Sequence, residues 1–317
     1  MTHFGTTADG RYVERITLEA GDLKVAILTL GAALHEVRLA GVDYNLTAGT
    51  DDVLAYAGDW RYHGTIIGPI ANRISTAQVK IEGMMHELER NQDGRIHLHS
   101  GKDATHFQVW SVVEQSASSV TLETILGDGL CGLPGKRTIR AVYTVTAPAT
   151  LTLSLTGTSD ADTMMNLAQH GYWNMDGSED WTGHSMHIAA NHYLPTDADA
   201  CPTGETAEVS DSLMDLRDGP EIASRTHIFD HNFCTATTKQ DLRDVVTLTG
   251  TRGVKMTMAT TETGIQIYDG RRLPMPYSAL AIEAQGWPDA PNHRGFPSIR
   301  LKAGETYAQT TSWRFET

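Results

Sequence analysis

The chain has 317 residues, long enough for two average domains but also for one large β architecture. Hydrophobic residues make up 40% of the chain and charged residues 20%, a composition that excludes a disordered or fibrous protein. The 25 Lys and Arg against 39 Asp and Glu give a net charge of −14. Such a charge repels phosphate backbones and anionic lipid, which argues against nucleic acid and membranes as partners.

The chain is expected to be cytoplasmic. Its N-terminus lacks the basic and apolar regions of a signal peptide. The longest apolar run, residues 25–34, is much shorter than the ~20 residues that cross a bilayer. No Pro-rich or Ser-rich linker interrupts the sequence, so we expect a single domain over residues 1–317, as a monomer or homodimer. An odd number of scattered cysteines without a CxxC pair is typical of a reducing compartment: Cys131, Cys201 and Cys234.

Alternation of apolar and polar residues dominates the chain and predicts half-buried antiparallel strands. Helical patterns are short, and each begins with Ser or Asp. In chain order we expect a helix at 51–57, strands at 140–146 and 150–156, a helix at 210–216, and strands at 246–249, 254–258 and 265–268. With 29 glycines and many Gly-Asp, Asp-Gly and Pro-Gly turn signals, this pattern predicts an all-β sandwich or barrel.

The sequence lacks the motifs of nucleotide hydrolysis, hydride transfer, zinc proteolysis and serine hydrolysis. Two polar segments occur in its first third. Asn72 and Arg73 stand between apolar residues, and an arginine fork there suits hydroxyls or a carboxylate. His97 and His99 have the spacing of a metal-binding His-x-His pair. No further ligand follows at a suitable distance, so we expect no metal.

Two further segments combine titratable and aromatic residues. His170 is followed by Gly, Tyr, Trp and Asn, a combination that can place the apolar face of a sugar on a ring while its hydroxyls are hydrogen-bonded. Glu283 lies in a strand-like run, and a loop with Trp287, Asp289 and Asn292 follows. A carboxylate on a strand that is followed by a polar, aromatic loop is a suitable general base.

Taken in order, these segments resemble the aldose 1-epimerase (galactose mutarotase) family over nearly the whole chain. The resemblance rests on Asn72-Arg73, Leu98-His99-x-Gly101, His170-x-Tyr-Trp-Asn174, Asp230-His-x-Phe233, Gly264-Ile-Gln266-Ile-Tyr268, Glu283-x-Gln285-x-x-Pro-Asp-Ala-x-Asn292 and the tail Phe296 to Tyr307. It implies a large antiparallel β-sandwich of the galactose mutarotase type, the supersandwich, with a few short helices. It also implies a cofactor-independent isomerase that interconverts the α and β anomers of a free aldose.

The resemblance also implies roles for seven residues. Glu283 corresponds to the catalytic base, His170 to the catalytic acid, and His99 to a second histidine that holds the substrate near its ring oxygen. Arg73, Asp230 and Gln266 correspond to the family's hydroxyl-binding positions, and Asn72 corresponds to a residue that supports the arginine.

Two expectations depend on these assignments. An unperturbed histidine is mostly neutral at pH 7, so we expect a neighbouring carboxylate, Glu283 or Asp230, to raise the pKa of His170.

The sequence departs from the family at Gly68-Pro69, at Ser100 and at Arg271, so the identity of the sugar substrate stays open. Arg271 suggests an anionic, phosphorylated or sulfonated sugar as one alternative. A carbohydrate-binding protein without catalytic activity is another, since a fold does not prove an activity.

Overall fold

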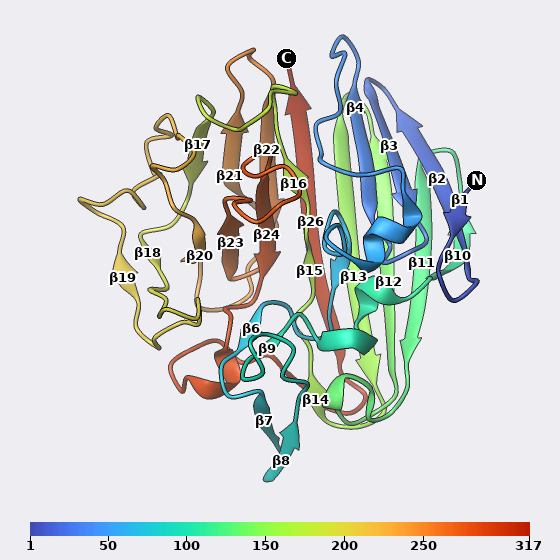
Figure 1. The fold of residues 1–317 in the computed structure, drawn as a ribbon, viewed down its shortest axis with the longest axis vertical. Coiled ribbons are helices and arrows are strands. Elements are labelled where there is room, and N and C mark those ends of the chain that lie inside the picture. The colour runs from blue at the N-terminus through green and yellow to red at the C-terminus, as the bar shows by residue number, and fades with distance from the viewer.

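A computed structural model describes residues 1–317. Its largest sheet is antiparallel and has eight strands (Figure 1). Its strand order is β10-β11-β12-β13-β26-β22-β21-β17. The strands are β10 (Ser111–Gln115), β11 (Ser119–Leu126), β12 (Arg137–Thr146), β13 (Thr150–Ser159), β26 (Thr306–Glu316), β22 (Lys255–Thr260), β21 (Arg243–Thr249) and β17 (Ser185–Ile188). The C-terminal strand β26 joins the two halves of this sheet, because it pairs with β13 on one side and β22 on the other.

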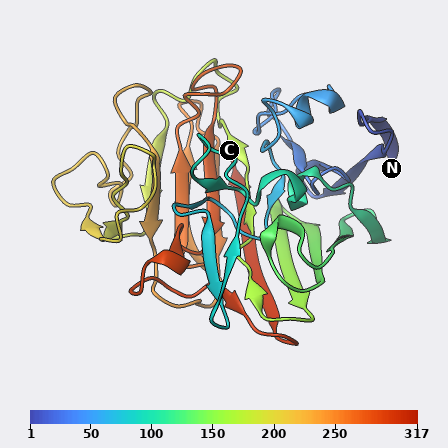
Figure 2. The ribbon, with the colours of Figure 1, turned by 60° about the horizontal axis from the view of Figure 1, so that its bottom comes forward.

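Two smaller sheets cover the two halves. A four-stranded sheet in the order β1-β2-β3-β4 lies over the β10–β13 half, as the blue and green strands show in Figures 1 and 2. A six-stranded sheet in the order β16-β24-β23-β20-β18-β19 covers the other half. Their strands are β1 (Thr2–Thr6), β2 (Tyr12–Ala20), β3 (Leu23–Leu28), β4 (Leu34–Leu39), β16 (Tyr172–Trp173), β24 (Leu280–Gln285), β23 (Gly264–Tyr268), β20 (Asp230–Cys234), β18 (His192–Tyr193) and β19 (Ala207–Glu208).

Short pairs of strands and single helical turns complete the fold. The pairs are β5 (Ile66–Ile67) with β15 (Ala168–Gln169), β6 (Arg73–Ile74) with β9 (His97–Leu98), β7 (Gln78–Ile81) with β8 (Met84–Glu87), and β14 (Thr163–Met164) with β25 (Arg300–Leu301). The helices are 3-10 turns: η1 (Val53–Ala57), η2 (Gly101–Asp103), η3 (Thr105–Phe107), η4 (Leu130–Gly132) and η5 (Ala290–Asn292). None of them has the length and apolar character that a membrane span requires.

One core of 52 buried side chains runs between the sheets. Strand β13 shows how the sequence builds it: Leu151, Leu153 and Leu155 are buried, while Thr152 and Ser154 between them lie on the opposite face and are only half-buried. The expected strands are therefore confirmed, and most are longer than their sequence patterns. The all-β sandwich with few helices is confirmed as well.

The two helix predictions had different outcomes. The 51–57 segment is helical as the single turn η1, and the Asp52 side chain accepts a hydrogen bond from the backbone N–H of Leu54. The helix predicted at 210–216 is wrong, because that segment forms turns. Asp211 has a left-handed φ of 59°, and the Ser212 hydroxyl donates to the carbonyl of Val209. Ser and Asp compete for backbone hydrogen bonds in this way, which opposes helix formation.

Strand β24 is buried along its whole length although it contains two polar residues. Ile282 and Ala284 belong to the core, while Glu283 and Gln285 lie on the opposite face of the six-stranded sheet. A buried carboxylate on the face opposite the core is costly unless it has a function or a partner. The six-stranded sheet thus presents one polar, buried surface.

Candidate active site

The centre of the polar surface is a contact between His170 and Glu283. Glu283 lies in the middle of β24, and His170 lies between β15 and β16. Because β16 pairs with β24 through Tyr172 and Ala281, the two side chains meet, with 3.4 Å between His170 Nε2 and Glu283 Oε1. The side chains are only 4% and 2% exposed. Glu283 Oε2 and His170 Nδ1 are buried without a hydrogen-bond partner.

Burial determines the protonation of this pair. It lowers the pKa of His170 to about 3, with a smaller contribution from His63. Burial also raises the pKa of Glu283 well above its ordinary value, and the charge of Asp230 adds to this effect. The expectation that a carboxylate raises the pKa of His170 is therefore wrong, since desolvation opposes both charges at once. Both shifts favour the neutral form of each partner, so that burial favours a proton on the carboxyl group over one on the imidazole.

His99 is positioned by an unusual backbone. Asn72 and His99 both have left-handed φ angles, 62° and 50°, just outside the paired strands β6 and β9. The backbone N–H of His99 donates to the carbonyl of Asn72, and the backbone N–H of Asn72 donates to His99 Nδ1. Burial and the neighbouring His170 lower the pKa of His99 well below its ordinary value. His99 is therefore neutral, and its proton is on Nε2, where it can be donated.

Arg73, Asp230 and Gln266 form a hydrogen-bonded row beside the pair. The two Nη atoms of Arg73 contact the Asp230 carboxylate at 3.4 and 3.2 Å, and Gln266 Nε2 donates to Asp230 Oδ1 at 3.0 Å. Gln266 is the cross-strand partner of Glu283. The side chains of Arg73 and Asp230 are 12% and 22% exposed, so solvent reaches the site from their side.

The structure brings all seven predicted residues into one continuous cluster. Asn72 links the row to His99, because its side-chain Oδ1 accepts from the backbone N–H of Arg73. The rings of His99 and His170 are 5.4 Å apart. Carboxylate, guanidinium, amide and imidazole groups thus surround the buried contact between His170 and Glu283, an arrangement that suits a small neutral ligand rich in hydroxyls.

Sequence reasoning missed several residues of this cluster. Gln92 accepts a hydrogen bond from Arg73 Nε. Tyr62 lies against His99 and His170. Tyr172, which belongs to the His170 motif of the sequence, also lies beside His170, with 4.9 Å between the two rings. The run Trp60-Arg-Tyr-His-Gly64 was an available signal, since three rings in a short turn are unusual on a protein surface.

Arg271, the basis of the anionic-sugar alternative, is already paired. Its Nε and Nη2 donate to the two carboxylate oxygens of Asp269 at 2.8 and 2.6 Å, and Nη2 also donates to the carbonyl of Phe229. Asp269 neutralises the guanidinium charge. Nothing in this geometry favours an anionic ligand.

His97 does not act together with His99. Its Nδ1 contacts the carbonyl oxygen of Glu89 at 2.7 Å. No group of three or more His, Cys, Asp or Glu side chains is arranged to hold a metal ion.

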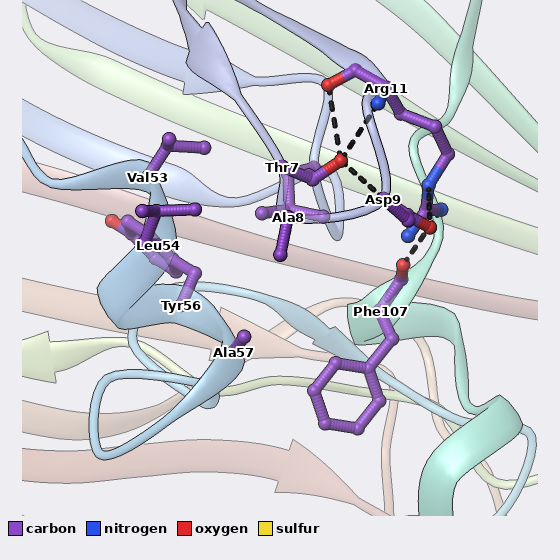
Figure 3. A pocket seen from close by; sticks show the side chains of 10 residues that line it. Thr7, Ala8, Asp9, Arg11, Val53, Leu54, Tyr56, Ala57 and Phe107 are labelled. Carbon is purple, nitrogen blue, oxygen red and sulfur yellow. Dashed lines mark hydrogen bonds and ion pairs between the residues drawn. The ribbon is translucent and has the colours of Figure 1, made fainter.

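A separate cavity of about 170 Å³ lies between η1 and the turn at residues 7–11 (Figure 3). Its walls are mainly apolar, with Val53, Leu54 and Phe107 among them. Asp9 and Arg11 form an ion pair with each other at 2.8 Å. None of the seven predicted residues lines this cavity, and it holds no buried acid and base.

Comparisons with known proteins agree with the geometry. Residues 14–314 match the family model for aldose 1-epimerase. The chain is 29% identical to galactose mutarotase of Rattus norvegicus, over 96% of this chain and 95% of that protein. It is also 29% identical to aldose 1-epimerase of Haemophilus influenzae, over 80% and 81%.

Solved structures give the same picture. An aldose epimerase homologue from C. elegans superposes with a TM-score of 0.89 at 25% identity, over 96% of this chain and 99% of that one. Galactose 1-epimerase from Lactobacillus acidophilus superposes with a TM-score of 0.84 at 24% identity, over 97% and 96%, and shows a shared fold.

Proposed function

The chain belongs to the aldose 1-epimerase family and is an isomerase of sugar anomers, and on this premise we propose that Glu283 and His170 carry out its reaction on a free aldohexose. The contact of 3.4 Å between these two side chains is the observation that carries the proposal. Anomer exchange requires a base that takes the proton of the C1 hydroxyl and an acid that protonates the ring oxygen.

The spacing of the pair fits this chemistry. The hydroxyl oxygen at C1 and the ring oxygen are bonded to the same carbon, so the base and the acid must work close together. Glu283 Oε1 takes the hydroxyl proton while His170 Nε2 gives its proton to the ring oxygen. The bond between C1 and the ring oxygen breaks, and C1 becomes an aldehyde. Rotation about the C1–C2 bond and the reverse transfers close the ring on its other face.

The proton count of the pair is consistent with these steps. Before ring opening the proton is on His170 and Glu283 is ionised; after it, Glu283 holds a proton and His170 is neutral. Burial favours the second distribution, because it raises the pKa of Glu283 and lowers that of His170. One internal transfer interconverts the two forms, so that neither a cofactor nor a proton from solution is required. Each positioned group contributes about 10²–10⁴-fold to the rate.

The remaining residues are proposed to hold the sugar. Arg73, Asp230 and Gln266 offer donors and acceptors for vicinal hydroxyls on the exposed side of the pair. The Nε2 proton of His99 is available to the ring oxygen or a neighbouring hydroxyl. Galactose is the first candidate substrate, since a relative similar over almost the whole chain is a galactose mutarotase; glucose is the second.

The buried acid–base pair separates this function from carbohydrate binding alone. A binding protein needs partners for hydroxyls, which the Arg73–Asp230–Gln266 row supplies, but it gains nothing from a desolvated carboxyl group beside a desolvated imidazole. Burying both groups costs stability, which indicates a catalytic use. We therefore place activity ahead of simple binding.

The test is the rate of anomer exchange with freshly dissolved α-galactose, measured by polarimetry or exchange NMR. The wild type should accelerate exchange, and Glu283→Gln should lower kcat by at least ~10²-fold with the fold intact by circular dichroism. Glucose and glucose 6-phosphate in parallel report the sugar preference. If the wild type binds galactose but does not accelerate anomer exchange, the protein is a carbohydrate-binding protein without this activity. Near-normal turnover by Glu283→Gln would show that Glu283 is not the catalytic base.

We also propose a cytoplasmic location. It is supported by the three cysteines, which are all free thiols. Reducing compartments keep thiols in this state.

A further inference from the structure

Tyr62 has a central place among the site's imidazoles. Its ring lies 5.6 Å from that of His170 at an angle of 17°, and 4.7 Å from that of His99. A third imidazole, that of His106, meets it edge-on at 5.2 Å. Tyr62 is therefore the ring that contacts both histidines assigned to the reaction, although it has no part in the acid–base steps above.

The turn that carries Tyr62 is tied to the segment that carries His170. The backbone N–H of Gly64 donates to the His170 carbonyl at 2.9 Å, and the N–H of His170 donates to the Thr65 carbonyl at 3.0 Å. Gly64 has a φ of 68°, and a Cβ atom there would lie 2.0 Å from the carbonyl oxygen of Leu34, so only glycine fits. The backbone of the turn that carries Tyr62 is thus held in place relative to the backbone of His170.

The His170 imidazole needs such a support. The torsion that rotates an imidazole about its Cβ–Cγ bond is soft, and a rotation moves Nε2 away from its reacting partner. A hydrogen bond at the other ring nitrogen usually prevents this, but His170 Nδ1 has no partner. What fixes the plane of the ring is contact with nearly parallel rings, namely Tyr62 at 17° and Tyr172 at 28°.

We propose that Tyr62 is a positioning residue for proton transfer: its ring orients the imidazoles of His170 and His99 and excludes water from both. This proposal rests on the proposed function. The role belongs to the ring, not to the phenolic hydroxyl. Stacked and edge-on contacts between aromatic rings have defined geometries, so one rigid side chain can fix two neighbours at once.

Water exclusion gives this role a signature in the pH dependence. Burial is the largest cause of the low pKa of both His170 and His99. Removing the Tyr62 ring admits water, and both pKa values then rise toward that of an exposed histidine, near 6.5. The other titratable or charged groups that face the two imidazoles are Glu283, His63, His106, His97, Tyr172 and Arg73.

The experiment compares Tyr62→Phe, Tyr62→Leu and Tyr62→Ala with the wild type. Tyr62→Phe should keep kcat within about threefold, because the ring remains, whereas Tyr62→Ala should lower kcat about 10- to 100-fold with a much smaller change in KM. Tyr62→Leu should fall between them. In ¹⁵N-histidine NMR, the His170 resonance should titrate closer to pH 6.5 in Tyr62→Ala and remain as in the wild type in Tyr62→Phe.

Tyr44→Ala is the matched control. Tyr44 is also half-buried, but it donates to the Met175 carbonyl outside the site. It should change neither kcat nor the His170 titration. Equal losses in Tyr62→Phe and Tyr62→Ala would assign the role to the hydroxyl, and a change in KM alone would make Tyr62 a sugar contact; each result overturns the proposal. The NMR titration needs no turnover, so it tests Tyr62 even if the wild type shows no anomer exchange.

Discussion

Two buried histidine–carboxylate pairs occur in this molecule, and they have opposite electrostatics. His170 and Glu283 lie 3.4 Å apart on the polar face of the six-stranded sheet. His184 and Asp176 lie 3.5 Å apart beside the turn that joins β21 to β22. All four side chains are at most 4% exposed. Residue types, distance and burial are almost the same, yet the carboxyl groups have different pKa values.

Hydrogen-bond donors account for the difference. Burial alone would raise the pKa of Asp176, but backbone N–H groups of Arg252 and Thr251 donate to its carboxylate and lower the pKa instead. Glu283 receives no such donor on Oε2, so burial raises its pKa. A carboxylate stabilised as an anion is a poor proton acceptor, whereas an unsatisfied one binds a proton readily.

The imidazoles differ in the same way. His184 Nε2 accepts a hydrogen bond from the backbone N–H of Met175 at 2.9 Å, while its Nδ1 faces Asp176 at 3.5 Å without a hydrogen bond. His170 has Glu283 and the faces of neighbouring rings, and its Nδ1 is unpartnered. Asp176 of the first pair holds the turn between β21 and β22, while the second pair is the one proposed to transfer protons.

Replacement of the two histidines should separate these roles most strongly. His170→Asn should lower kcat for anomer exchange about 10²–10⁴-fold, since it removes the proposed acid. His184→Asn should keep kcat within about twofold. It should lower the free energy of unfolding by about 1–3 kcal/mol, because the buried backbone N–H of Met175 loses its acceptor, His184 Nε2. Anomer exchange and urea unfolding measure the two effects. Loss of activity in a folded His184→Asn protein would contradict the purely structural role of the His184–Asp176 pair.

The carboxylate of the structural pair gives the next effect in size. Asp176→Asn should lower the free energy of unfolding by roughly 1.5–3 kcal/mol, since hydrogen bonds to a charged acceptor become neutral ones. The folded variant should retain wild-type kcat. Urea unfolding at pH 7 measures the loss, and unchanged stability would show that the donors of Thr251 and Arg252 contribute nothing to the fold.

Much of this architecture could be predicted from local patterns. The alternation in 150–156 marks one face as core, because period two is the geometry of a strand. The same rule describes Ile282, Glu283 and Ala284, since the structure places Glu283 on the face opposite the core. Pairing across distant strands, such as β26 between β13 and β22, has no local signal. The extent 1–317 of a single domain and the monomer or homodimer state stay predictions.

The residues of the candidate site were proposed from the resemblance to a known family, and the structure brings them together, but their electrostatics were not predicted. The pKa of His170 was expected to rise because the sequence contains carboxylates that can lie near it. The burial of His170, which lowers its pKa, cannot be recognised from the sequence. The burial of His170 depends on packing from β24 and the Tyr62 turn, which are both far from His170 in the chain. Tyr62 was missed for the same reason, since its contacts with His99 and His170 arise only in the folded chain.

Stability as a function of pH gives the sharpest contrast between the two carboxyl groups. The folded-state pKa of Glu283 is raised above its ordinary 4.5, so unfolding releases its proton above pH 4.5 and stability falls as the pH rises through the folded pKa. The pKa of Asp176 is lowered below 3.8, so its contribution to the free energy of unfolding is present above that pH and is lost as the pH falls through the folded pKa.

Glu283→Gln should therefore be more stable than the wild type at pH 8, by roughly 1.4 kcal/mol for each unit by which the Glu283 pKa is raised, and equal to it near pH 4. Urea unfolding of the wild type and Glu283→Gln from pH 4 to 8 measures this difference. A constant difference over that range would mean that Glu283 is ionised in the folded protein and that the two pairs are electrostatically alike.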